Sequence, residues 1–192
     1  FFVFETIAQL WSDFLSPESL QTIKKGMYYT ELIHPGLRLI ALNTAVLWYQ
    51  DACPDSTKDP AGQFSWLKRV LTQARKDGEK VYLISHVPPG WDEIDNGPEM
   101  REAFNDVFVD AMNGNYDLIT ASFWGHVHVD SFRIFQDQSD VGIKNKVYSI
   151  WFLQGAVTPR PDENPSIGFF TYSTTTPFTL LDRQTMWFNL TL

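Results

Sequence analysis

The chain has 192 residues, a formal net charge of -8 and 44% hydrophobic residues. This apolar content is enough to build a buried core, so an intrinsically disordered chain is excluded. The acidic balance excludes a nucleic-acid scaffold, because a polyanion would be repelled, whereas a small phosphate substrate is compatible with it if a metal ion supplies positive charge.

The chain opens on Phe1 inside a helical pattern that covers residues 1–15. No basic segment precedes an apolar run here and no small-residue cleavage site follows, so this helix is not a signal peptide. No apolar stretch in the sequence reaches the length that spans a bilayer. Because the chain starts without Met inside a helix, we expect it to be cut from a longer protein.

A second helix is predicted over residues 17–25, between Ser16 as its N-cap and Gly26 as its stop. Two strand patterns follow it, over Met27–Leu32 and Leu37–Asn43, and a turn that contains proline and glycine joins them. The N-terminal part of the chain therefore predicts two helices and a hairpin.

The middle of the chain alternates between helix and strand patterns. After a loop over residues 44–58, an amphipathic helix begins at Asp59 and ends at Gly78. The apolar strand Val81–Ser85 follows, and another helix begins near Pro98. The apolar stripe of this second helix consists of Met100, Ala103, Phe104, Val107, Phe108 and Ala111.

Strand patterns dominate the remainder of the chain. They are Leu118–Trp124, Phe132–Phe135, Val147–Leu153, Ile167–Tyr172, Phe178–Leu181 and Met186–Leu190. An alternating first half and a second half made almost wholly of strands predict an α/β (α+β) fold, a sandwich of mixed β-sheets flanked by helices.

Three of the four histidines lie at or just beyond the end of an apolar strand pattern. His86 follows Val81–Ser85, and His126 and His128 follow Leu118–Trp124 after Gly125. The carboxyl ends of strands are where ligands gather in open α/β sheets. In an extended chain the two histidines of His-x-His would point to one face, about 7 Å apart. That distance suits a close pair of metal ions, roughly 3.5–4 Å apart.

Each histidine taken singly is also compatible with a structural, hydrogen-bonded role. His34 precedes a Pro-Gly turn and has no partner motif, so we interpret it as a turn residue on the surface. The combination of a strand-end histidine with Gly-His-x-His is less common than either element, and it favours His86, His126 and His128 as metal ligands.

Four segments resemble the calcineurin-like metallophosphoesterases, and within them the acid sphingomyelinase and acid sphingomyelinase-like phosphodiesterase family. These are residues 36–44 (GLRLIALNT), 59–67 (DPAGQFSWL), 80–90 (KVYLISHVPPG) and 123–132 (FWGHVHVDSF). Shorter matches in the tail are AVTP at 156–159, NPSI at 164–167 and FNLT at 188–191. Several segments in the family's order cover nearly the whole chain and are more specific than any single motif.

The resemblance implies that His86 and His126 bind one zinc ion and that His128 binds a second. It implies phosphodiester hydrolysis by a water that the two ions activate. Asp130 is a candidate partner that orients an imidazole, and surface solvation or a turn hydrogen bond is an alternative for it. The substrate is either a phosphocholine lipid such as sphingomyelin or a nucleotide-type phosphodiester.

The family's other metal-binding motifs are missing from the sequence, which has no Asp-x-His, Gly-Asp-x-x-Asp or Gly-Asn-His. We therefore expect residues 1–192 to form the C-terminal half of the catalytic domain and to be inactive alone. The proton-donating histidine would lie outside the chain. Cys53 is the only cysteine, and it sits where relatives place a disulfide cysteine, but the region near Trp91 offers no partner.

The resemblance also predicts a secreted or lysosomal glycoprotein. The sequon at Asn189 is compatible with that route. An apolar surface for peripheral contact with a membrane could be formed by Phe1, Phe2, Trp48 and Trp91. The alternative from another class is a non-catalytic binding module that has kept the fold.

Overall fold

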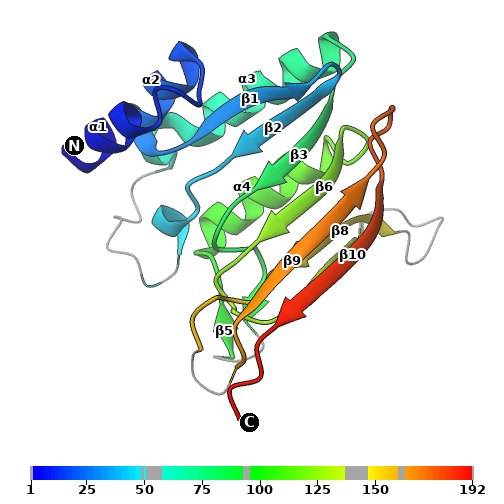
Figure 1. Cartoon of the computed structure of the whole chain (residues 1–192). Helices are drawn as coiled ribbons and strands as arrows, with labels where there is room; N and C mark the ends of the chain where they lie inside the picture. The colour runs from blue at the N-terminus through cyan, green and yellow to red at the C-terminus, as the bar shows by residue number, and fades with distance from the viewer. Residues whose placement is uncertain are drawn as a thin grey trace.

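A six-stranded mixed sheet forms the centre of the computed structural model, which describes residues 2–48, 50, 58–92, 96–136, 147–159 and 163–191. The strands, in spatial order, are β1 (Tyr29–His34), β2 (Leu37–Ala41), β3 (Lys80–Ile84), β6 (Ile119–Trp124), β8 (Val147–Leu153) and β7 (Ser131–Gln136). Strands β2, β3, β6 and β8 run parallel, and β1 and β7 are antiparallel edges. The four parallel strands therefore end at one edge of the sheet (Figure 1).

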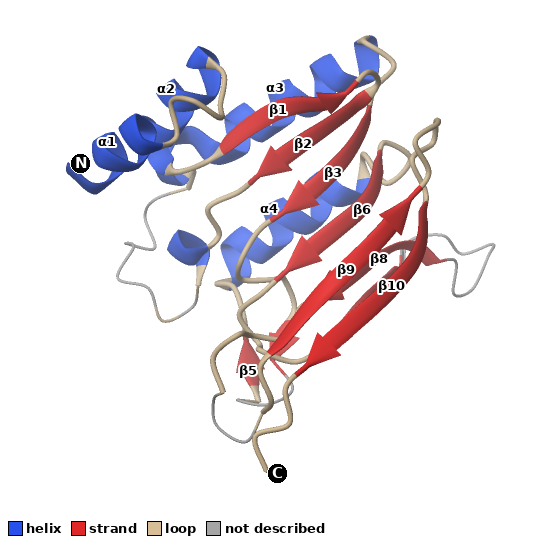
Figure 2. Cartoon of the chain, in the orientation of Figure 1, coloured by secondary structure: helices blue, strands red, loops and turns tan. Residues whose placement is uncertain are grey.

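Helices α3 (Gln63–Lys76) and α4 (Glu102–Asn113) cover one face of this sheet, whereas α1 (Phe2–Leu10) and α2 (Pro17–Gly26) lie beside the edge strand β1, as Figure 2 shows. Short 3-10 turns lie at Ala45–Leu47 and Pro60–Gly62. The predicted cap at Ser16 is confirmed, because its hydroxyl oxygen accepts a hydrogen bond from the Ser19 amide. Helix α3 begins at Gln63 rather than at Asp59, although the Asp59 carboxylate accepts a hydrogen bond from the Phe64 amide in its first turn. None of the described helices combines the length and apolarity needed to cross a bilayer.

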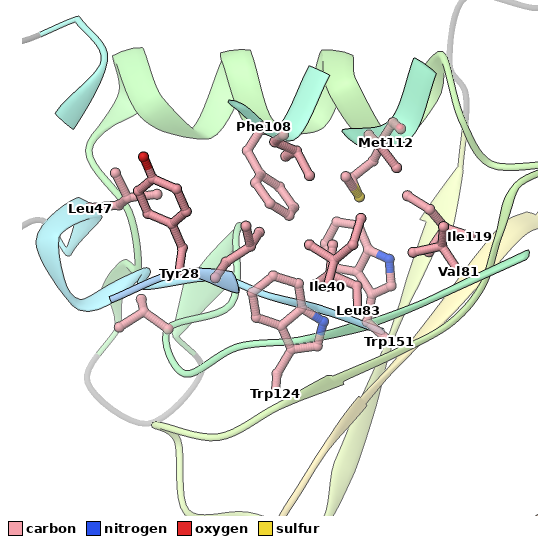
Figure 3. Packing of buried hydrophobic residues seen from close by; sticks show 14 of the residues in the cluster. Tyr28, Ile40, Leu47, Val81, Leu83, Phe108, Met112, Ile119, Trp124 and Trp151 are labelled. Atoms are coloured by element: carbon pink, nitrogen blue, oxygen red, sulfur yellow. The ribbon is translucent and has the colours of Figure 1, made fainter. Parts of the chain in front are cut away.

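The main core lies between the sheet and helices α3 and α4 (Figure 3). Because side chains alternate along a strand, every second residue of the parallel strands points to these helices. Its largest fully buried members include Trp124 and Phe108, whose rings meet edge to face with centroids 5.5 Å apart. This packing fixes strand β6 and the start of the loop that follows it.

A hairpin of β9 (Ser166–Tyr172) and β10 (Leu180–Trp187) packs on the other face of the sheet. Phe170 of β9 contacts Phe123 of β6 edge to face, with ring centroids 4.7 Å apart. A small two-stranded ribbon, β4 (Trp91–Asp92) with β5 (Gly97–Pro98), follows the loop after β3. Two packed sheets flanked by helices confirm the predicted mixed α/β class.

Two predictions about elements are wrong. The separate strands predicted at Phe178–Leu181 and Met186–Leu190 overlap the two ends of one strand, β10, which pairs with β9 over Leu180–Trp187. Helix α4 begins at Glu102 rather than near Pro98, and it turns Val107 outward with 43% exposure. Its buried residues Phe104, Phe108 and Met112 are spaced by four, so the apolar stripe is narrower than predicted.

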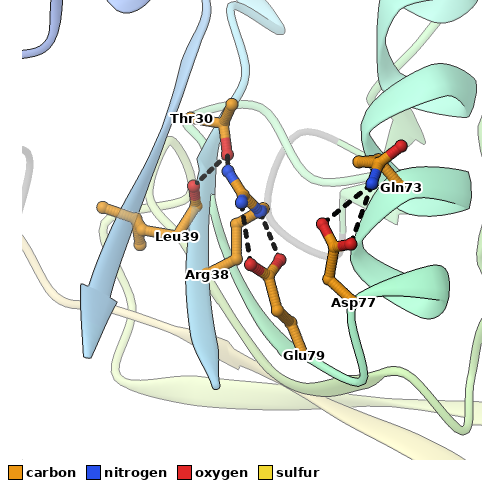
Figure 4. Close-up of polar contacts among 6 residues, drawn as sticks. All are labelled: Thr30, Arg38, Leu39, Gln73, Asp77 and Glu79. Atoms are coloured by element: carbon orange, nitrogen blue, oxygen red, sulfur yellow. Dashed lines mark hydrogen bonds and ion pairs between the residues drawn. The ribbon is translucent and has the colours of Figure 1, made fainter. Parts of the chain in front are cut away.

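A buried ion pair lies at the opposite edge of the sheet, where helix α3 leads into β3 (Figure 4). The Arg38 guanidinium donates from Nε to Glu79 Oε2 at 2.5 Å and from a terminal nitrogen to Glu79 Oε1 at 2.9 Å. The side chains of Arg38 and Glu79 are 19% and 8% exposed. This two-point contact ties β2 to the start of β3.

Stability above pH 10 is expected to depend on Tyr82. Its hydroxyl donates to the carbonyl oxygen of Phe178, and burial, with a smaller effect of Tyr172, raises its pKa from 10 to about 12. A raised folded-state pKa means that the stabilisation is complete below pH 10 and is lost as the pH rises through 12. In urea unfolding at pH 8, 10 and 11, Tyr82→Phe should show a smaller decline than the wild type. A decline equal to that of the wild type would contradict this, and Tyr116→Phe, at an exposed site, is the control.

Candidate metal centre

The structure brings two of the predicted histidines together at the carboxyl edge of the parallel strands. His86 lies two residues beyond the end of β3, and His126 lies two residues beyond the end of β6. Strands β3 and β6 are parallel neighbours, so their following loops meet (Figure 1). The Gly125 amide donates to the His86 carbonyl oxygen at 3.0 Å, which continues the pairing of the two chains beyond the strands.

The two imidazoles are spaced as ligands of a single ion are. His86 Nε2 lies 3.4 Å from His126 Nδ1, and the ring centroids are 5.1 Å apart. For metal–nitrogen bonds of about 2.0–2.1 Å at a tetrahedral angle, two nitrogen ligands lie about 3.3 Å apart. A direct hydrogen bond between the rings also fits this distance when one nitrogen carries a proton. The separation of the two nitrogens is therefore compatible with a shared metal ion and with a hydrogen bond between the rings.

Gly125 makes this approach of the rings feasible. A Cβ at this position would lie 3.0 Å from His86 Nδ1, a distance tighter than nine in ten such contacts in proteins. A larger residue would require the His86 ring to move by a few tenths of an ångström, so close packing rather than an unusual backbone angle favours glycine before His-x-His.

His126 and His128 do not lie in an extended chain, which corrects the prediction of alternating side chains. Their φ angles are 73° and 64°, in the left-handed region that residues other than glycine seldom adopt. The Val127 amide donates to the Gly125 carbonyl oxygen at 2.9 Å, two residues back, so His126 occupies the centre of a γ-turn. With a positive φ, this is the rare and strained class of γ-turn. Strain of this kind gathers at functional sites.

His128 lies beside a cavity of about 540 Å³ rather than in the His86–His126 pair. The other lining residues are Val129, Asp130, Glu163, Asn164, Ser166, Thr185 and Trp187. His128 is still close enough to act on His86: partial burial lowers the pKa of His86, and the charge of His128 lowers it further. A lowered pKa keeps the imidazole neutral near pH 7, as metal binding requires.

Asp130 forms an ion pair with Arg183 of strand β10. Arg183 also donates to the carbonyl oxygens of Ser131 and Leu153, at 3.1 and 2.7 Å. These contacts tie the histidine loop to the second sheet. Orientation of an imidazole by Asp130 stays a prediction.

Sequence reasoning did not identify Glu99, Arg133 or the role of Trp48. Glu99 Oε2 lies 3.6 Å from His126 Nε2, and its Oε1 accepts from Arg133 at 2.9 Å. The Trp48 ring meets the His126 ring edge to face, at 5.3 Å between centroids. A signal did exist for Arg133, because strand alternation places it inward between Phe132 and Ile134, which are exposed. No periodic pattern marks Glu99.

Other predicted residues lie elsewhere. His34 ends β1 at the opposite edge of the sheet, and its ring contacts Phe178 at 5.5 Å. Asn189 follows β10, and its Oδ1 accepts from the Thr191 hydroxyl at 2.7 Å. Cys53 and Phe1 lie outside the described residues. Trp91 on β4 is 54% exposed, and Phe2 on α1 is also exposed.

The donor set at the loop ends is nitrogen-rich. Imidazole ligands suit zinc and several other first-row metals, and both His86 and His126 present a ring nitrogen to the same space. Across the described part of the chain, no group of three or more His, Cys, Asp or Glu side chains is arranged to hold one ion. The arrangement is thus a ligand pair with a third histidine beside it.

No family model matches the chain. It is 38% identical to Sphingomyelinase phosphodiesterase C of Dictyostelium discoideum, over 98% of the chain and 44% of that protein. It is 36% identical to Acid sphingomyelinase-like phosphodiesterase 3b of Homo sapiens, over 98% of the chain and 43% of the relative. It is 33% identical to Cyclic GMP-AMP phosphodiesterase SMPDL3A of Homo sapiens, over 98% of the chain and 42% of the relative. The chain spans less than half the length of these curated relatives.

Proposed function

Because this chain is homologous over 98% of its length to the acid sphingomyelinase-like phosphodiesterases, we propose that it is the C-terminal half of the catalytic domain of a metal-dependent phosphodiesterase. The observation that carries the proposal is the 3.4 Å separation of His86 Nε2 and His126 Nδ1 at the carboxyl ends of two parallel strands. Metal ligands are expected at that edge of such a sheet.

In this proposal His86 and His126 hold one zinc ion and His128 contributes to a second. Bound zinc would polarise a phosphoryl oxygen and lower the pKa of a water molecule to near 7. The chain's own residues orient these groups: the Gly125 amide fixes the His86 backbone, and Trp48 packs against the His126 ring. The lowered pKa of His86 keeps its lone pair available at neutral pH.

The cavity beside His128 is suited to the organic part of a small phosphodiester. Its volume of about 540 Å³ is within the range of ligand pockets, and Trp187 supplies an aromatic surface. The cavity lining offers no uncompensated positive charge, because Arg183 is paired with Asp130 and Glu163 is itself acidic, so a metal would be needed to retain the phosphoryl group. The sphingomyelin and nucleotide classes differ in this organic part.

Measured substrate preference of the complete enzyme would separate these two classes. Phosphocholine release from sphingomyelin vesicles, compared with hydrolysis of a cyclic dinucleotide or another nucleotide phosphodiester, assigns the substrate. The relatives' names include both kinds of substrate. Exposed Trp91, next to the site, is compatible with peripheral contact with a lipid surface.

The 192-residue chain alone is expected to be inactive. Three neutral imidazoles leave two divalent ions without the carboxylate that would offset their charge. Hydrolysis of a chromogenic phosphodiester by the purified chain with added Zn²⁺ should equal the buffer rate, and a protein that adds the rest of the relatives' length should be active. Turnover by the chain that a chelator abolishes would show that it holds a complete site. If the longer protein is also inactive, a binding module is the better description.

A secreted or lysosomal location is part of the same proposal. The sequon Asn189-Leu190-Thr191 is partly accessible, and the Thr191 amide and hydroxyl both contact Asn189 Oδ1. A loss of mass upon endoglycosidase treatment of the protein from a eukaryotic secretory host, absent in Asn189→Gln, would support glycosylation. An unchanged mass would contradict it.

A further inference from the structure

A buried carboxylate lies against the side of His126 that faces away from His86. The Glu99 side chain is only 1% exposed, and its Oε2 is 3.6 Å from His126 Nε2. On the other side of the same ring, Nδ1 is 3.4 Å from His86 Nε2. The two ring nitrogens of His126 therefore face chemically different partners.

Arg133 fixes the orientation of this carboxylate. It donates to Glu99 Oε1 at 2.9 Å, to the Pro89 carbonyl oxygen at 2.8 Å and to the Trp91 carbonyl oxygen at 2.7 Å. Because Oε1 is directed to Arg133, Oε2 is the oxygen that faces His126. The Glu99 amide also donates to the Gly90 carbonyl oxygen at 2.9 Å, which anchors its backbone to the turn after His86.

We propose that Glu99 is a positioning residue that selects the Nε2–H tautomer of His126 and so directs the Nδ1 lone pair towards His86. A neutral imidazole carries its proton on one nitrogen only. An N–H facing the carboxylate is attracted to it, whereas a lone pair facing it is repelled. At 3.6 Å the contact is longer than a hydrogen bond, but the Glu99 side chain is 1% exposed and that of His126 is 20% exposed, so solvent screens the attraction only in part.

Ring packing makes the choice of tautomer matter. Trp48 meets the His126 ring edge to face, and the backbone of His126 is held in a γ-turn. With the ring confined in this way, the tautomer decides which nitrogen can bind a metal. A carboxylate that holds the far nitrogen of a ligand histidine is a general means of orienting the ligand. The role of Nδ1 as a ligand rests on the proposed function, whereas the tautomer does not.

The competing explanation is that Glu99 only balances the charge of Arg133. The chain offers a matched control, because Glu79 is another buried carboxylate paired with an arginine, at the opposite edge of the sheet and away from the three strand-end histidines. Glu99→Gln and Glu79→Gln each remove one buried charge from an Arg–Glu pair while keeping side-chain shape. Only the first should change His126.

The experiment is a long-range ¹H–¹⁵N correlation of the histidine rings in the metal-free 192-residue chain at pH 8. The wild type should show His126 with its proton on Nε2. In Glu99→Gln the ratio of the Nε2–H to the Nδ1–H form should fall about tenfold, the order of effect of one contact with a charged group. Zn²⁺ alone, added to the same samples, should bind 10–100-fold more weakly to Glu99→Gln, a loss of about that size being usual for such partners.

The inference is overturned if wild-type His126 carries its proton on Nδ1, or if folded Glu99→Gln keeps the wild-type ratio. It is also overturned if Glu79→Gln shifts the ratio equally. If Glu99→Gln does not fold, the position of the His126 proton in the wild type tests the proposal by itself. The tautomer is measured without metal or substrate. The proposed role of Glu99 can therefore be contradicted even if phosphodiesterase activity is found, and it can be confirmed even if that activity is absent.

Discussion

Replacing His126 by alanine is expected to weaken Zn²⁺ binding to the chain by about 100-fold or more. His86 and His126 present nitrogens at the spacing of two ligands on one ion, 3.4 Å apart. Loss of an outer partner of a ligand already costs about 10–100-fold in affinity, so loss of the ligand itself should cost at least as much. Competition with a chromogenic zinc chelator at pH 7.5 measures the affinity.

The control for this experiment is the one predicted non-ligand histidine. His34 ends strand β1, at the edge of the sheet opposite to His86, and packs against Phe178. His34→Ala should leave the zinc affinity within about twofold of the wild type, because no ligand is removed. Equal losses in His34→Ala and His126→Ala would show that zinc binds to scattered surface histidines instead of this pair.

Replacing Arg38 by methionine is expected to lower the free energy of unfolding by about 3 kcal/mol. Breaking a buried pair by removing one partner costs about 3–5 kcal/mol, because the remaining charge is buried without compensation. The lower end applies because the Arg38 side chain is 19% exposed, while that of Glu79 is 8% exposed. Urea unfolding at pH 7 measures the change, and an unchanged slope would show that the denatured state is not affected.

A second substitution should largely reverse this loss. In Arg38→Met with Glu79→Met, no charge is left in the buried space, and two apolar side chains of similar length pack between β2 and α3. Such replacements are often neutral or stabilising, so the double variant should lie within about 1 kcal/mol of the wild type. If the losses of Arg38→Met and Glu79→Met, each measured singly, simply add in the double variant, the two side chains have no coupling energy, and the explanation by an uncompensated buried charge is contradicted.

The sequence predicted the location of the site better than its geometry. Strand patterns before His86 and His126 placed both residues at the ends of strands, and the parallel pairing of β3 with β6 brings these ends together. Most helix and strand positions followed from periodicity and caps, as at Ser16. These features depend on local sequence, which is why they can be predicted.

Features that depend on contacts distant in sequence could not be predicted. The bond from the Gly125 amide to the His86 carbonyl oxygen joins two loops and helps to hold His126 in a γ-turn, which no local pattern indicates. The partnership of Glu99 with Arg133 joins residues 34 positions apart. The boundary of α4 was misplaced for a related reason, since Gly97–Pro98 pairs with Trp91–Asp92 instead of starting a helix.

The left-handed backbone at His126 and His128 has a consequence for attempts to improve the protein in the laboratory. Glycine and asparagine occupy φ angles of 73° and 64° at lower cost than histidine does. A library sorted for thermal resistance or expression alone would therefore be enriched in those residues at the two positions. Directed evolution of this chain therefore needs a second screen for metal binding, because selection for stability alone would replace the two histidines.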